Sequence, residues 1–171
     1  MRRGSPTRRV IPAALLAAAA AVLLCACAAS SHTPRATPAA GTSTLIARLD
    51  RLAVRRSDAF PQNHLRFSFP AHAVVTDPQA VRQVARALLA LPRLRPGVYA
   101  GPVDLGVAYH LTFFAGARPV WRVTVDATGM QNVVGAGAGR VADRGFWTTL
   151  AGAMGLADPG SVDFGGSFPA S

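Results

Sequence analysis

Two adjacent stretches of strictly alternating side chains constrain the fold of this chain more than any other feature. Val107–Phe114 and Val120–Asp126 each place large apolar residues at every second position. Alternation with a period of two puts the two sets of side chains on opposite faces of a β-strand. Ala115–Arg118 separates the two runs and predicts a hairpin turn. The chain is therefore expected to form an antiparallel sheet with one buried face.

Shorter patterns on either side of this hairpin extend the predicted sheet. One strand is expected after it, at Met130–Val134. Two are expected before it, at Leu49–Arg56 and Leu65–Phe69; Pro70 interrupts the second, and Ala71–Thr76 can continue as another short strand. In both earlier strands apolar residues alternate with arginine or serine, which is typical of strands that bury a single face. These strands place several arginines on the outward face.

Two amphipathic segments predict helices. Asp77 and Pro78 suit the cap and the first position of one helix, which Pro92 ends. Asp143 can cap another helix that runs to about Met154. The expected order is β-β-α-β-β-β-α. This order predicts an α+β fold, with an antiparallel sheet of four to five strands and two helices packed on one face.

The first thirty residues have the layout of a secretory signal peptide. A basic start, Met1–Arg9, precedes an apolar run at Ala13–Leu24, and small residues follow. The run is shorter than the roughly 20 residues that a membrane-spanning helix needs. Thr7–Ile11 is similar to the start of a twin-arginine signal, so export by that route and by the general route are both open.

The end of the apolar run resembles a bacterial lipobox, in which Leu, a small residue and Ala or Gly precede the modified cysteine. Leu24, Ala26 and Cys27 match this pattern, and Cys25 departs from it. The resemblance implies cleavage before Cys27 and a lipid on its thiol. We therefore expect lipid anchoring on the extracytoplasmic face of the cell membrane. The alternative is secretion after an ordinary cut, because Ala26-Cys27-Ala28 has the small-x-small form.

These features divide the chain of 171 residues into four parts. Residues 1–26 are the signal peptide, and residues 27–42 are the anchor cysteine and a flexible tether rich in Pro, Ser, Thr and Ala. Residues 43–156 form the single α+β domain. Residues 157–171 are rich in Gly, Ser and Pro, and we expect them to form a disordered tail.

The charge of the chain is a weak guide to its partners. The formal charge is +10, and every charged side chain is Arg or Asp, as expected from the coding bias of a GC-rich genome. The arginines are scattered among acids, so we do not expect nucleic-acid binding. Both cysteines, Cys25 and Cys27, belong to the signal region. This excludes disulfides, cysteine nucleophiles and cysteine-based zinc sites from the domain, and no cofactor or metal is predicted.

Candidate ligand-binding residues lie on the outward face of the predicted sheet or next to it: Arg55, His64, His110 and Arg122. A basic sheet face can bind an anionic envelope polymer, a lipid headgroup or an envelope protein, although a solvated surface has the same pattern. The leading interpretation is a non-enzymatic binding module. The alternative is an envelope hydrolase that uses His64 or His110 with an aspartate. No G-x-S-x-G or H-E-x-x-H motif supports that alternative.

Three segments also resemble a set of small actinobacterial lipoproteins: Val54–His64, Tyr109–Phe113 and Val123–Gly129. The resemblance covers most of the chain after the signal. It implies an envelope lipoprotein, and it brings no activity and no site residues with it.

Overall fold

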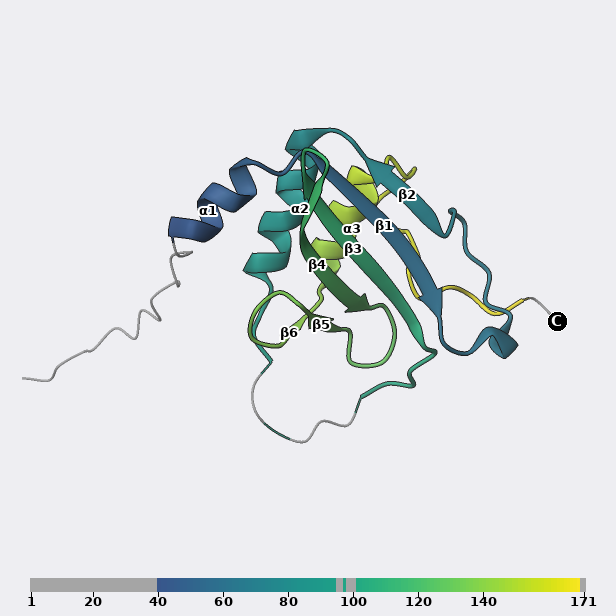
Figure 1. Cartoon of the computed structure of the whole chain (residues 1–171). Coiled ribbons are helices and arrows are strands. Elements are labelled where there is room, and N and C mark those ends of the chain that lie inside the picture. The colour runs from purple at the N-terminus through teal and green to yellow at the C-terminus, as the bar shows by residue number, and fades with distance from the viewer. Residues whose placement is uncertain (1–39, 95–96, 98–100, 170–171) are drawn as a thin grey trace, which may run out of the picture. The chain divides into compact units, whose positions relative to one another are not determined.

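The computed structural model describes residues 40–94, 97 and 101–169 (Figure 1). The predicted signal peptide, the lipid-anchor cysteine Cys27 and most of the tether lie outside the described residues. Within the described part of the chain, no helix has both the length and the hydropathy needed to cross a membrane.

A single antiparallel sheet of six strands organises the domain, in the spatial order β2-β1-β3-β4-β5-β6. Its centre is the predicted hairpin, in which each strand is nine residues long and Gly116 lies in the turn between them. The pairing places Leu111 opposite Val123, as the alternation requires. The strands are β1 Arg51–Asp58, β2 His72–Val75, β3 Val107–Ala115, β4 Arg118–Asp126, β5 Asn132–Val134 and β6 Arg140–Val141.

Two helices cover one face of this sheet, α2 (Pro78–Ala90) and α3 (Arg144–Ala153) (Figure 1). Each begins at a predicted aspartate cap. The Asp77 carboxylate accepts hydrogen bonds from the N–H groups of Gln79 and Ala80, and Asp143 accepts one from Phe146. The α+β class, the antiparallel sheet and the placement of these two helices on one face are therefore confirmed.

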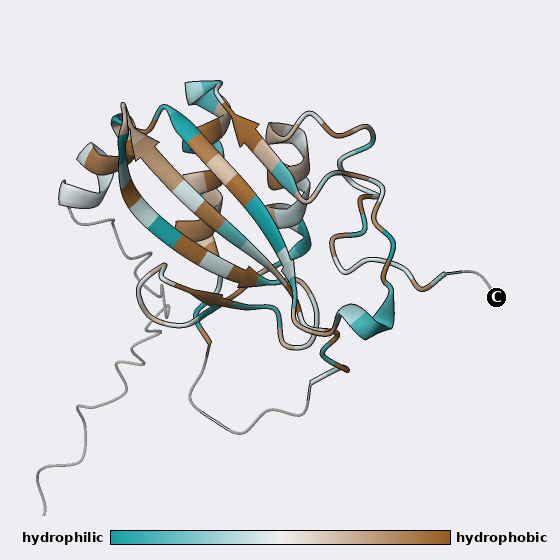
Figure 2. Ribbon diagram, turned by 45° about the vertical axis from the view of Figure 1, so that its right-hand side comes forward, coloured by the Kyte–Doolittle hydropathy of each residue, from teal (hydrophilic) through white to brown (hydrophobic). Residues whose placement is uncertain are grey.

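The core lies between the sheet and these helices. Every second residue of β3 is buried there, and α2 contributes its apolar stripe: Val107, Tyr109, Leu111, Phe113, Val81, Val84, Ala85 and Leu88. Figure 2 shows hydrophilic and hydrophobic residues alternating along the strands. No described helix covers the opposite side of the sheet, which we call the open face.

The number of elements differs from the prediction of four to five strands and two helices. The sheet has six strands, because the short strand β6, which consists of Arg140 and Val141 alone, pairs with β5. A third helix, α1 (Ala40–Ala47), begins within the expected tether, before the expected domain boundary at residue 43. A short 3-10 turn, η1 (Pro61–Asn63), follows β1.

The predicted strand at Leu65–Phe69 is wrong. Only Arg66 forms a bridge there, with Ser167, and β1 pairs instead with β2. Pro70 lacks an N–H group, so a continuous ladder cannot run through it, and pairing begins just beyond. The rings of Phe67 and Phe69 make other contacts, and the Arg56 guanidinium lies 3.5 Å from the centre of the Phe67 ring.

The C-terminal segment differs from the disordered tail that its composition predicts. Within residues 157–169, Ser167 forms a bridge with Arg66, and the Phe164 side chain is only 4% exposed. The Tyr109 hydroxyl donates a buried 2.9 Å hydrogen bond to the Phe164 carbonyl oxygen. Burial raises the pKa of Tyr109 well above its usual value, so the hydroxyl keeps the proton that it donates. One buried aromatic side chain thus anchors a segment whose composition is typical of a linker.

Candidate functional site

Strand register gathers polar and basic side chains on the open face. Arg55 lies directly opposite His110 on β3 and opposite His72 on β2, and His110 lies opposite Thr124 on β4. These four side chains form one line across the sheet. The neighbouring line, two residues along each strand, runs from Val74 through Ala53 and Thr112 to Arg122.

A depression of about 480 Å³ lies over these two lines. Its basic lining residues are Arg55, His72, His110 and Arg122, and no aspartate lines it. The small Ala53 side chain lies between the flanking Arg55, Val74 and Thr112 and leaves room above it. The site is therefore a shallow hollow with positively charged walls.

The two arginines are placed to act on the same ligand. Arg55 is on β1 and Arg122 is on β4, with β3 between them, and the two positions are offset by two residues along the strands. For ordinary strand spacings, their Cα atoms are therefore about 12 Å apart. Two extended arginine side chains can meet across such a gap, with the Thr112 hydroxyl below them. Both side chains are exposed, and neither makes a hydrogen bond or ion pair within the described residues. Their donors are free for a ligand.

His110 is held by neighbours on both sides of its ring. Its Nε2 lies 2.9 Å from the Ser57 hydroxyl oxygen, and its Nδ1 lies 3.1 Å from the Thr124 hydroxyl oxygen. A neutral imidazole has one donor and one acceptor nitrogen, and two hydroxyls can satisfy either tautomer. The ring is therefore fixed in orientation and forms a rigid wall between Arg55 and Thr124.

Ser57 and His110 have the contact that a nucleophile and its base make, but the described residues around them do not supply the other groups of an acyl-transfer site. Thr124, not an aspartate, holds the second ring nitrogen. The N–H groups of β3 lie in the plane of the sheet and bond to β1 or β4, so none points out of the open face to stabilise an oxyanion. The geometry favours binding over acyl transfer.

Asp126 is the carboxylate that interacts electrostatically with His110, so it is the candidate for a catalytic partner of that ring. Burial is the main reason that its pKa is raised, and the charge of Asp104 raises it further, while His110 lowers it. Asp126 makes no hydrogen bond to the His110 ring. It therefore contributes a partly desolvated charge beside the site without completing a triad.

The structure brings together three of the four predicted site residues, Arg55, His110 and Arg122. His64 lies elsewhere, exposed at the end of η1 in a left-handed conformation with φ of 50°. The sequence reasoning missed His72 and Thr112. The signal for His72 was the short apolar run at Ala71–Thr76, which forms the true partner of β1 once Pro70 is taken as the end of the preceding segment. The signal for Thr112 was the alternation within Val107–Phe114, which places it on the same face as His110.

Comparisons with known protein families, curated proteins and solved structures found no match. Within the described residues, no group of three histidine, cysteine or acidic side chains is placed to hold a metal ion. The function is therefore inferred from the geometry of the open face.

Proposed function

We propose that this protein is an exported, lipid-anchored envelope protein whose domain binds an anionic polymer on its open face, without catalysis. The observation that carries this proposal is the depression walled by Arg55, His72, His110 and Arg122, which has no acid among its described lining residues. Guanidinium groups donate paired hydrogen bonds to carboxylate and phosphate oxygens, which are the common charged groups of such polymers.

The strength of exposed ion pairs favours a polymer over a small anion. One solvent-exposed pair contributes only about 0.2–1 kcal/mol, so Arg55 and Arg122 together would hold a single small anion weakly. A chain of repeated charges engages both arginines and keeps further groups close by, which raises the effective concentration at the site.

The membrane anchor rests on the sequence pattern around Cys27. Twelve residues separate Cys27 from the start of α1 at Ala40. Fully extended, they span about 40 Å, so an acylated Cys27 would keep the domain close to the membrane surface. Mass spectrometry of the mature N-terminus tests this: a diacylglyceryl cysteine at Cys27 is expected, and an unmodified secreted chain would end this part of the proposal.

The binding site is tested by removing its charge without changing its shape. We expect Arg55→Gln with Arg122→Gln to weaken binding of polyphosphate and poly-glutamate about two- to thirtyfold in fluorescence anisotropy at low salt, from two exposed pairs of about 0.2–1 kcal/mol each. The matched control is Arg48→Gln with Arg86→Gln, which removes the same charge from two exposed arginines, one directly after α1 and one on α2. Equal weakening by both double variants would show a general charge effect and overturn the site.

The hydrolase alternative has one observation in its favour, the 2.9 Å contact between Ser57 and His110. An activated serine reacts covalently with a fluorophosphonate, because its oxygen attacks phosphorus and displaces fluoride. Mass spectrometry after such treatment should show no adduct if the domain only binds. An adduct on Ser57 that disappears in His110→Ala would replace the binding proposal with the hydrolase.

A further inference from the structure

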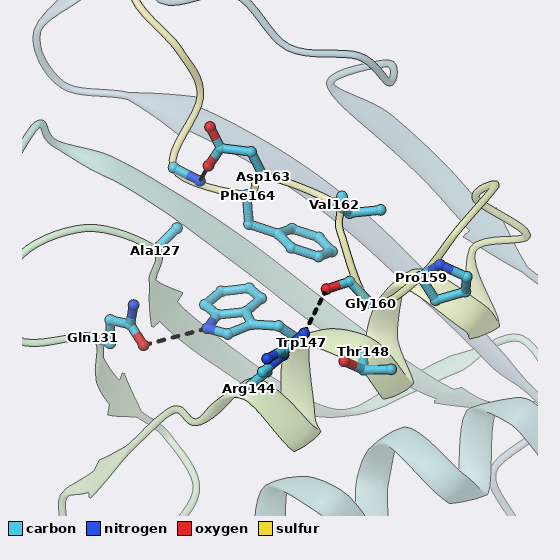
Figure 3. Close-up of a pocket in the computed structure, with 11 residues that line it drawn as sticks. Ala127, Gln131, Arg144, Trp147, Thr148, Pro159, Gly160, Val162, Asp163 and Phe164 are labelled. Atoms are coloured by element: carbon cyan, nitrogen blue, oxygen red, sulfur yellow. Dashed lines mark hydrogen bonds between the residues drawn. The ribbon is translucent and has the colours of Figure 1, made fainter.

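A second depression lies between α3 and the C-terminal segment, and its lining includes none of the residues of the open-face site. It has a volume of about 400 Å³ and is lined by the turn after β4, the first half of α3 and residues 159–165. Figure 3 shows the rings of Trp147 and Phe164 beside each other at its centre. Their centroids are 4.7 Å apart and their planes are inclined by 30°.

Four polar side chains surround these rings with unused hydrogen-bonding capacity. Arg144 makes one long bond of 3.4 Å, to the Gly160 carbonyl oxygen, and its other donors have no partner within the described residues. The Gln131 carbonyl oxygen accepts from the Trp147 indole at 3.4 Å, which leaves its amide N–H groups free (Figure 3).

The other two polar groups are the Asp163 carboxylate, which accepts hydrogen bonds, and the Thr148 hydroxyl, which can donate and accept. One oxygen of Asp163 accepts a 3.0 Å bond from the Gly165 N–H, and the second oxygen has no partner in the described part of the chain. The Thr148 hydroxyl has none there either. Arg144 and Asp163 form no ion pair with each other, so the pocket keeps one positive and one negative group available.

This combination excludes most ligand classes. A purely apolar ligand would strip water from the free polar groups at a cost of about 1–3 kcal/mol each. A simple anion would meet Asp163, and a simple cation would meet Arg144. The complementary ligand is uncharged overall, carries many groups that both donate and accept, and has an apolar face for the partly exposed Trp147 ring.

We infer that this pocket binds a pyranose sugar. Each sugar hydroxyl is at once a donor and an acceptor, and neighbouring hydroxyls match the paired atoms of a carboxylate, an amide or a guanidinium. The C–H face of the ring packs against an aromatic side chain, as other apolar groups do. The volume is at the small end of the range for small-molecule sites, so about one or two sugar rings would fit.

The test uses Trp147 as its own reporter. The chain has two tryptophans, so Trp121→Phe leaves Trp147 as the single emitter in the mature protein. Titration with neutral pyranose trisaccharides, built from glucose, galactose, mannose or N-acetylglucosamine, should give a saturable change in emission with at least one of them. Gln131→Ala and Thr148→Ala should each weaken that binding about tenfold.

Thr149→Ala is the matched control, because the Thr149 hydroxyl bonds to the Gly145 carbonyl oxygen within α3 and does not line the pocket. Circular dichroism establishes that each variant is folded. Binding that Thr148→Ala and Thr149→Ala weaken equally would overturn the inference. So would the absence of a saturable change with every sugar at millimolar concentration, or saturation by the zwitterionic dipeptide Ala-Ala instead.

Discussion

Replacing Phe164 with alanine tests whether the C-terminal segment belongs to the fold. The Phe164 ring contacts three other aromatic rings, with centroids 5.3 Å from Phe69, 5.3 Å from Tyr109 and 4.7 Å from Trp147. Gly165 and Gly166 follow it and offer little further burial. Phe164 is therefore the largest buried side chain that the segment contributes, beside the backbone bridge between Arg66 and Ser167.

The size of the effect follows from the area that the ring buries. An aromatic side chain buries about 150–250 Å², and at about 25 cal/mol per Å² this corresponds to roughly 4–6 kcal/mol as an upper bound. Alanine keeps one carbon, and measured losses for Phe→Ala in cores are about 3–5 kcal/mol. We expect Phe164→Ala to lower the free energy of unfolding by about 3–5 kcal/mol, a large share of the 5–15 kcal/mol typical of domains.

Urea unfolding followed by circular dichroism measures this loss. Phe168→Ala is the control, because Phe168 is in the same segment but 60% exposed, and its loss should be within about 0.5 kcal/mol. If Phe164→Ala also costs less than about 1 kcal/mol, the segment does not pack in solution. The composition-based expectation of a disordered tail would then be right.

Two further substitutions test the region around the open face. Burial and the charge of Asp104 raise the pKa of Asp126, so the folded state binds the Asp126 proton more tightly than the unfolded chain does. The contribution of Asp126 to the free energy of unfolding is therefore present at low pH and is lost as the pH rises through the raised pKa. Asp126→Asn should therefore increase the free energy of unfolding at pH 7 and give no gain near pH 3; equal gains at both pH values would refute the reasoning. Gly135 has a φ of 94°, and a Cβ there would collide with the Arg122 carbonyl oxygen, so Gly135→Ala should destabilise the domain by more than about 1 kcal/mol. An unchanged melting temperature in Gly135→Ala would contradict that conformation.

Local patterns predicted the centre of the fold. The hairpin of β3 and β4 follows from alternation within each strand, and α2 and α3 follow from aspartate caps and apolar stripes. Each of these signals is contained in about ten residues. For the same reason Arg55, His110 and Arg122 were placed on a common face before the order of the strands was known.

Features that depend on distant partners were not predictable in this way. Two residues of β6 carry no periodicity, and they become a strand only because β5 lies beside them. Phe164 lies in a stretch of glycine and serine, and its burial depends on rings from β3 and α3. His72 could join the site only after the register of β2 was fixed.

The two faces of β3 separate the packed core of this domain from the polar residues of its open face. Tyr109 points toward the helices and holds the C-terminal segment, while its neighbour His110 points toward the open face. A substitution on the open face therefore leaves the packed interior in place. The charge and shape of the open face can therefore change one residue at a time while the same core keeps the chain folded.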